Sequence, residues 1–322
     1  MASLLSVENL QVQFQTKKGI NTAVDGVSFS VEKGRILGIV GESGCGKSVT
    51  SMSILQLLGS NARISGGSIK LDGKELIGLP EKEMCRIRGN DIAMIFQDPM
   101  TALNPTLTIG TQLMEPIMLH QNSGKKEAWT RAVDVLKRVG IAAPEKRMKE
   151  YPHQLSGGMR QRVMIAMAVS CEPRLLIADE PTTALDVTIQ AQILELMCEL
   201  REKMGTAIML ITHDMGVVAE TADDVLVLYA GKAVEYGSIE DIFERPKHPY
   251  TQGLLNSIPR LDEDVELLNT IEGTVPAPDA MPAGCRFAPR CPYGKDRCMK
   301  EKPGVYHAGN SLVSCFRYEG EK

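Results

Sequence analysis

The stretch Gly41-Glu42-Ser43-Gly44-Cys45-Gly46-Lys47-Ser48 lies between an apolar run, residues 36–40, and a helical pattern that begins near Val49. It matches the phosphate-loop motif G-x-x-x-x-G-K-[ST], with the preceding strand and following helix that this motif requires. Glycines let the backbone fold around an anion with its N–H groups pointing inward, and the helix N-terminus adds partial positive charge. The stretch therefore predicts a nucleotide phosphate site.

The chemistry of this loop assigns a role to each polar side chain. Lys47 is expected to reach the β- and γ-phosphates, and the Ser48 hydroxyl is expected to ligate Mg²⁺. A glycine-rich turn between a strand and a helix, without a ligand, is the alternative. The residues expected to line the nucleotide at this end are Gly41, Ser43, Gly44, Cys45, Gly46, Lys47, Ser48 and Val49.

Length and composition limit what the phosphate site can serve. A chain of 322 residues, 43% of them apolar, is long enough for about two domains with a sizeable core. Its formal net charge of −4 gives no bulk attraction to nucleic acid, so no nucleic-acid partner is expected. The sequence shows neither a signal peptide nor a run long enough to span a membrane. We therefore expect a cytoplasmic location, where its eight cysteines are not expected to form a disulfide framework.

The pattern along the chain predicts an α/β fold. Strands and turns occupy residues 5–95, a helical pattern follows over residues 98–155, and helices and strands alternate again from Ser156. Alternation around a phosphate loop predicts a P-loop ATPase core with a mainly parallel sheet, helices on both faces and an N-terminal antiparallel β region. We expect this core over residues 1–240, with residues 98–155 as an inserted helical subdomain and residues 241–322 as a small loop-rich module.

Local signals place the elements of this fold. Asp72-Gly73 predicts a tight turn after residues 69–71. The expected helices include residues 108–120 and 125–139. The expected strands are residues 7–14, 27–31, 35–40, 67–71, 92–96, 175–178, 207–211 and the group 225–234.

Two adjacent carboxylates follow the apolar strand at residues 175–178. Asp179 and Glu180 would lie at the carboxyl edge of the sheet, where the phosphate loop also opens. Asp179 suits a Mg²⁺ ligand, direct or through water, and Glu180 suits a group that polarises an attacking water. Two solvated carboxylates that cap the next helix are the alternative.

The stretch Leu155-Ser156-Gly157-Gly158-Met159 is the most discriminating one. Ser156 can cap the helix that follows, and the two glycines expose its N–H groups to an incoming phosphate. By itself this is only a well-capped helix. Together with the motifs above it resembles the signature of the ATP-binding-cassette (ABC) family, and the resemblance covers residues 1 to about 240. The other motifs follow in family order: Gln97 of the Q-loop, Asp179 and Glu180, Ala184-Leu185-Asp186 of the D-loop, and the switch residue His213.

The resemblance implies a mechanism and a partner. In this family two cassettes pack head to tail, and each ATP lies between the phosphate loop of one and the signature of the other, which makes Ser156, Gly157 and Gly158 nucleotide-binding residues. Glu180 would orient water for attack on the γ-phosphate, and His213 would sense that phosphate. Gln97 would contact Mg²⁺ and the water. Phe14 is our candidate for the aromatic residue that stacks on adenine.

Further stretches are similar to the dipeptide/oligopeptide importer ATPases. These importers pair two unlike ATPase subunits, and this chain resembles the D-type subunit more than the F-type subunit. The stretches are residues 95–105, 151–154, 186–192 and 248–255. This group also contains nickel and glutathione importers, and its substrate cannot be inferred from this chain. The resemblance implies a second, unlike ATPase subunit, two integral membrane permease subunits, an extracytoplasmic substrate-binding protein and a peripheral location at the cytoplasmic face of the membrane. A soluble ATPase that acts on nucleic acid or ribosomes is the alternative.

The cysteines near the C-terminus suggest a metal site. Cys285, Cys291, Cys298 and Cys315 are separated by five, six and sixteen residues in a segment with little periodicity. Four thiolates suit zinc or an iron–sulfur cluster, and the spacing favours neither. The family resemblance implies a [4Fe–4S] cluster, with zinc or four unliganded thiols as the alternatives.

Cys45 departs from the family's usual small residue in the phosphate loop. A thiol is small enough for the turn, so a neutral substitution is the first interpretation. The alternative hypothesis is a reactive thiol, because Lys47 and the helix N-terminus would lower its pKa.

Overall fold

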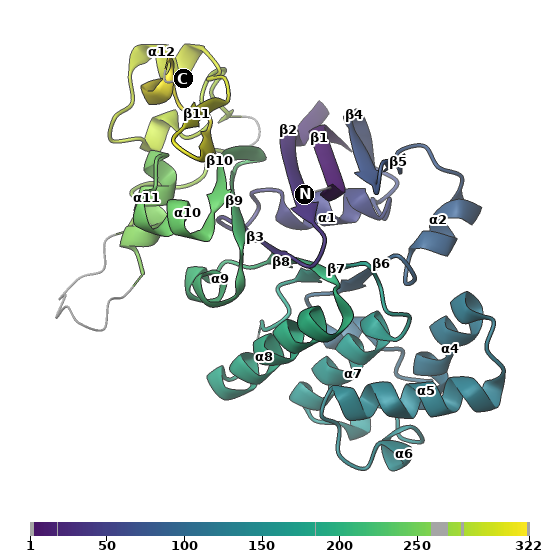
Figure 1. Ribbon diagram of the computed structural model, residues 1–322. Helices are drawn as coiled ribbons and strands as arrows, with labels where there is room; N and C mark the ends of the chain where they lie inside the picture. Colours follow the sequence, from purple (N-terminus) through teal and green to yellow (C-terminus); the bar gives the residue numbers. More distant parts are fainter. Residues whose placement is uncertain (1–2, 18, 184, 259–269, 278–279, 321–322) are drawn as a thin grey trace. The chain divides into compact units, whose positions relative to one another are not determined.

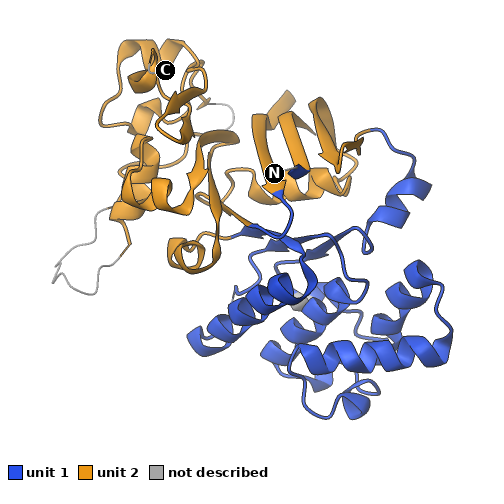
Figure 2. Cartoon of the chain, in the orientation of Figure 1, with its two compact units in different colours: residues 1–4, 32–35, 78–211 blue, residues 5–31, 36–77, 212–322 orange. Residues whose placement is uncertain are grey.

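The computed structural model describes residues 3–17, 19–183, 185–258, 270–277 and 280–320 (Figure 1). The chain divides into two compact units, each assembled from separated segments (Figure 2). Unit 1 comprises residues 1–4, 32–35 and 78–211, and unit 2 comprises residues 5–31, 36–77 and 212–322.

Unit 1 contains three parallel strands that are almost entirely buried. β6 (Ile92–Ile95) pairs with β7 (Leu175–Asp179), and β7 pairs with β8 (Ala207–Ile211). Every residue of β7 and β8 is buried. Parallel strands covered on both faces read as continuous apolar runs, which is why the sequence located these strands correctly.

The helical part of unit 1 follows β6. α4 (Ile109–Gln121) and α5 (Lys125–Arg138) pack against each other and against α7 (Gly157–Val169). α4 begins where the Thr108 hydroxyl accepts a hydrogen bond from the N–H of Thr111. Both predicted helices in this region are confirmed to within a residue or two at their ends. The remaining helices of unit 1 are α2 (Glu81–Ile87), α3 (Pro99–Ala102), α6 (Pro144–Arg147), η1 (Pro152–Gln154) and α8 (Val187–Met204).

Unit 2 carries the antiparallel region at the start of the chain. It forms a four-stranded sheet in the order β2-β1-β4-β5. Asp72 and Gly73 have φ of 48° and 82°, and the turn they form pairs Leu71 with Lys74. Both residues have the positive φ that a two-residue hairpin turn requires, so the predicted turn is confirmed. These strands are β1 (Ser3–Thr16), β2 (Gly19–Glu32), β4 (Ala62–Leu71) and β5 (Lys74–Glu75).

A second set of strands in unit 2 surrounds β3 (Ile36–Val40). β3 pairs in parallel with β9 (Asp224–Tyr229), which returns through a turn at Ala230 and Gly231 into the antiparallel β10 (Lys232–Ser238). The structure thereby resolves the strand group expected at residues 225–234 into a hairpin.

The C-terminal segment of the chain joins this set of strands. β12 (Ser311–Val313) pairs with β10, and β11 (Tyr306–Ala308) pairs with β12. The helices among the described residues of unit 2 are α1 (Lys47–Ile54), α9 (Met215–Thr221), α10 (Ile239–Glu244), α11 (Pro249–Asn256), η3 (Ala288–Arg290), α12 (Asp296–Lys300) and η4 (Phe316–Tyr318). The predicted α/β fold, with its parallel and antiparallel parts, is confirmed. Among the described residues, no helix combines the length and the apolar character needed to cross a bilayer.

Candidate nucleotide site

The predicted phosphate loop connects β3 to α1 in unit 2. Gly46 precedes α1 in a left-handed conformation, with φ of 100°. Gly41 has φ of 148°, and a Cβ at this position would lie 2.1 Å from the carbonyl oxygen of Leu228. Only glycine lets the backbone pass this close to β9, which explains on steric grounds why position 41 requires a glycine.

The loop holds its lysine and exposes its hydroxyls. Lys47 is 6% exposed, and its Nζ donates hydrogen bonds to the carbonyl oxygens of Gly41 at 2.7 Å and Glu42 at 3.2 Å. The side chains of Ser43 and Ser48 are exposed, as is Gly44, whereas Val49 is half-buried on α1. An ammonium group, a helix N-terminus and hydroxyl groups thus meet in one loop, which is the chemistry that binds a phosphate.

Cys45 corrects one expectation. Its side chain is 1% exposed, and this burial raises the pKa of the thiol although Lys47 acts to lower it. The interpretation of Cys45 as an activated thiolate is therefore wrong, because removing a thiolate from water outweighs one nearby ammonium group.

Unit 1 brings Gln97 and Glu180 together. Asp179, 4% exposed, ends β7, and Glu180 follows it with φ of 47° while its N–H donates to the carbonyl of Ile211. The amide Nε2 of Gln97 donates to Glu180 Oε2 at 2.9 Å, and the Thr183 hydroxyl donates to the same oxygen at 3.0 Å. This carboxylate is held in one orientation at the carboxyl end of its strand.

The signature stretch in unit 1 starts α7 as expected. The Ser156 hydroxyl accepts a hydrogen bond from the N–H of Met159, Gly157 is exposed and Gly158 is half-buried. The N–H groups of the first helical turn therefore face outward, where an external anion can reach them. In the D-loop, Asp186 caps α8, and Ala184 lies outside the described residues.

The remaining predicted nucleotide contacts lie in unit 2. His213 is exposed between Thr212 and Asp214, and the Asp214 carboxylate caps α9. Phe14 is half-buried on β1, where it pairs with Ala62 of β4. Their roles toward a nucleotide remain predictions.

Two family models match this chain. The model described as "ABC transporter" matches residues 24–183, and the model described as "Oligopeptide/dipeptide transporter, C-terminal region" matches residues 234–298. The chain is 56% identical to the oligopeptide transport ATP-binding protein AppD of Bacillus subtilis (strain 168), over 100% of this chain and 98% of that protein. The chain belongs to the ABC transporter family. This ABC ATPase hydrolyses ATP to power transport.

Other relatives are similar over nearly the whole chain. The ABC ATPase is 52% identical to the oligopeptide transport ATP-binding protein OppD of Escherichia coli (strain K12), over 98% of this chain and 93% of that protein. It is 54% identical to the dipeptide transport ATP-binding protein DppD of Bacillus subtilis (strain 168), over 98% of this chain and 95% of that protein.

Solved structures share the cassette fold. A dimeric structure of MJ0796, a bacterial ABC transporter cassette, matches with a TM-score of 0.66 and 28% identity over 73% of this chain and 98% of that chain. A structure of cbiO1 from Clostridium perfringens, part of the ABC transporter complex cbiONQ, matches with a TM-score of 0.65 and 28% identity over 76% of this chain and 92% of that chain.

The prediction of a [4Fe–4S] cluster on Cys285, Cys291, Cys298 and Cys315 is wrong. These cysteines line one cavity of about 80 Å³. In the described part of the chain, however, no three His, Cys, Asp or Glu side chains converge in a way that could hold a metal ion, a finding that also argues against zinc. The matched models and the named relatives describe transport ATPases and name no such cluster.

Burial also affects the thiol groups of these cysteines. Burial raises the pKa of Cys285 to about 11 and also raises the pKa values of Cys291 and Cys315. Burial therefore favours the neutral thiol over the thiolate at these positions.

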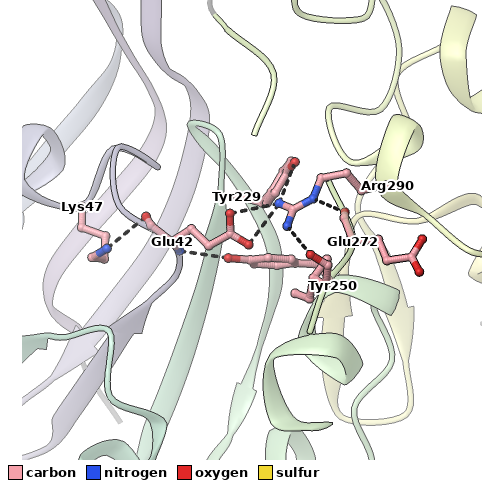
Figure 3. A network of polar contacts seen from close by, with 7 residues as sticks. Glu42, Lys47, Tyr229, Tyr250, Glu272 and Arg290 are labelled. Carbon is pink, nitrogen blue, oxygen red and sulfur yellow. Dashed lines mark hydrogen bonds and ion pairs between the residues drawn. The ribbon is translucent and has the colours of Figure 1, made fainter. Parts of the chain in front are cut away.

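The structure also shows partners of the phosphate loop that the sequence analysis missed. Glu42 contacts Tyr250 and Arg290, and Arg290 contacts Tyr229 (Figure 3). Tyr250 lies in the stretch 248–255 that resembles the importer group, but nothing local to Arg290 indicated a link to the loop.

Proposed function

We propose that this ABC ATPase powers the import of dipeptides or oligopeptides. The observation that carries the proposal is identity of 50% or more to peptide-transport ATP-binding proteins across both the cassette and the C-terminal region. We assign residues 1–240 to the nucleotide-binding domain, with residues 98–155 as its helical subdomain. Residues 241–322 form the extension of this importer group, which the match at residues 234–298 supports.

The proposed assembly pairs this chain head to tail with a second ATPase subunit. The exposed N-terminus of α7 supports this arrangement, because it offers N–H donors and partial positive charge to a phosphate held by another subunit. The dimeric state of the MJ0796 cassette also supports it. We place the pair at the cytoplasmic face of the membrane beneath two permease subunits, with an extracytoplasmic binding protein that delivers substrate.

In the proposed site, the phosphate loop binds the ATP phosphates, while Asp179 and Glu180 support hydrolysis. Lys47 and the loop N–H groups hold the β- and γ-phosphates, and Phe14 stacks on the adenine. We assign the hydroxyl of Ser48, the carboxylate of Asp179 and the amide oxygen of Gln97 as the Mg²⁺ ligands, since all three are oxygen donors, and the cation would neutralise phosphate charge when bound.

Glu180 orients the attacking water. Its Oε2 accepts hydrogen bonds from Gln97 and Thr183, so the carboxylate keeps one orientation while it polarises a water toward the γ-phosphate. Since Gln97 donates its Nε2 to Glu180, its carbonyl oxygen is the atom left to ligate a cation. His213, two residues after the end of β8, contacts the γ-phosphate in this proposal.

Transport measurements test the proposal. The chain is purified from native membranes with the subunits that accompany it, and the assembly is reconstituted into liposomes with its binding protein. Labelled dipeptides and oligopeptides should enter only with ATP. The same liposomes are offered nickel and glutathione, and uptake of either without peptide uptake would contradict the proposal. Purification without any membrane subunit would contradict transport altogether.

A further inference from the structure

Glu42, the second residue of the phosphate loop, is held on three sides. Its backbone N–H donates to the Tyr250 hydroxyl at 2.9 Å. Its carbonyl oxygen accepts a hydrogen bond from Lys47 Nζ at 3.2 Å, and both oxygens of its carboxylate accept from Arg290 Nη1 at 3.0 Å (Figure 3). Two of these three partners come from the C-terminal part of the chain.

Arg290 is built into this position rather than resting on the surface. Its side chain is 6% exposed. Nε donates to the carbonyl of Glu272 at 2.9 Å and Nη2 to the carbonyl of Ile271 at 3.1 Å, while the guanidinium lies 5.7 Å from the ring centroid of Tyr229. A guanidinium held by fixed carbonyls has little freedom, so it presents Nη1 to Glu42 in one direction.

Tyr250 is equally constrained. Its ring is fully buried and packs edge-on against Tyr229, with centroids 4.7 Å apart, and against Phe287 at 5.4 Å. The helix that carries it, α11, is capped by His248, whose Nδ1 accepts from the N–H of Tyr250 at 3.1 Å. Buried aromatic packing of this kind fixes the direction of the hydroxyl that receives the Glu42 N–H.

An indirect path links the same region to Cys45 in the loop. Arg286 donates to the carbonyl of Ala230 and pairs with Asp25 at 3.1 Å. Gly231, which follows Ala230, donates its N–H to the carbonyl of Cys45 at 2.9 Å. Arg290 therefore contacts the loop directly at Glu42, whereas Arg286 is linked to Cys45 only through Ala230 and Gly231.

We infer that the C-terminal region sets the shape of the phosphate loop through Glu42, and that Arg290 is a positioning residue for ATP binding. The inference rests on the proposed role of residues 41–48 in holding the ATP phosphates. The affinity of such a loop depends on N–H groups that already point at the anion. Without Arg290, the Glu42 carboxylate loses its buried partner and turns toward water, and the backbone around it follows.

The test uses three variants of the full chain in its assembled transporter: R290M, E42Q and the double variant. We expect R290M and E42Q each to raise KM for ATP about tenfold, with a smaller fall in kcat. The double variant should be no worse than either single one, because the pair acts as a unit. A residue that only stabilised the fold would reduce the active fraction, and hence kcat, and would leave KM unchanged.

R297M is the matched control. Arg297 lies in the same C-terminal region and pairs with Glu301 and Glu319, but it is 47% exposed and its described ion pairs do not involve the loop. Its KM should stay within about twofold of the wild type. If R290M fails to fold, the KM of E42Q alone tests the inference. This variant keeps the shape of Glu42 and leaves Arg290 its carbonyl partners.

The outcomes separate this inference from the proposed function. Wild-type KM in E42Q, or additive effects in the double variant, would overturn the inference. Failure of the wild-type chain to bind ATP would instead refute the role proposed for the loop.

Discussion

Substituting Gly41 by alanine tests whether the phosphate loop depends on its close approach to β9. A Cβ on residue 41 would lie 2.1 Å from the Leu228 carbonyl oxygen and 2.8 Å from Cys45 Sγ, so the backbone must shift. The positive φ of 148° adds strain for any L-residue, about 1–3 kcal/mol. The steric overlap adds about 1–3 kcal/mol.

Gly44 provides a matched control in the same loop. It also has a positive φ, 77°, but a Cβ there would have no heavy atom within 4 Å. G44A therefore carries the conformational cost alone, about 1–2 kcal/mol. G41A adds the steric overlap with Leu228 to its conformational cost, so it should bind ATP at least about fivefold more weakly than G44A.

Equilibrium titration of the purified chain with a fluorescent ATP analogue measures both affinities, and thermal unfolding without nucleotide checks the fold. The free G41A loop can relax away from Leu228, and ATP binding must then restore the strained shape. We therefore expect a lowered affinity with a nearly unchanged melting temperature. Equal affinities of G41A and G44A would refute the reasoning, because the contact with Leu228 would then play no part in the shape of the loop.

Three further predictions follow. E180Q should bind ATP like the wild type but lose turnover by about 10²–10⁴-fold, because it removes the group that polarises the water. The control E195Q, on the exposed face of α8, should hydrolyse ATP normally. Normal turnover in E180Q would contradict the role of Glu180 in orienting the water. Burial acts to raise the pKa of Asp25, but Lys232, Lys302 and Arg286 lower it overall, so its folded pKa lies below an unfolded value of about 3.9. Its stabilisation is therefore complete above about pH 4 and disappears as the pH falls through the folded pKa. D25N should destabilise the chain by about 1–3 kcal/mol at pH 7, and urea unfolding at pH 7 and pH 3 should show that the difference shrinks in acid; an equal difference at both pH values would contradict the ion pairs. Maleimide at neutral pH should label the exposed Cys85 well before the buried Cys45, since burial raises the pKa of the Cys45 thiol. Peptide mass spectrometry identifies the labelled cysteine, and labelling of Cys45 first would contradict its burial.

The sequence by itself determined the features that depend on neighbouring residues. The phosphate loop, the apolar strands β7 and β8, the Asp72-Gly73 turn and the Ser156 cap each follow from short-range spacing or from the φ preferences of single residues. Local steric and hydrogen-bonding preferences act over a few residues, so these elements are legible without knowledge of the fold.

Only the tertiary structure decided what surrounds those features. Arg290 lies 248 positions from Glu42, and β12 is added to β10 across more than 70 residues, so neither contact leaves a periodic trace in the sequence. Proximity to Lys47 suggested a reactive thiolate at Cys45, whereas burial raises the pKa of that thiol. The family resemblance suggested a cluster on Cys285, Cys291, Cys298 and Cys315, whereas the described side chains do not converge into a metal site. Burial and long-range hydrogen bonds are properties of the folded chain, and they set the charge and position of side chains that the sequence could only locate.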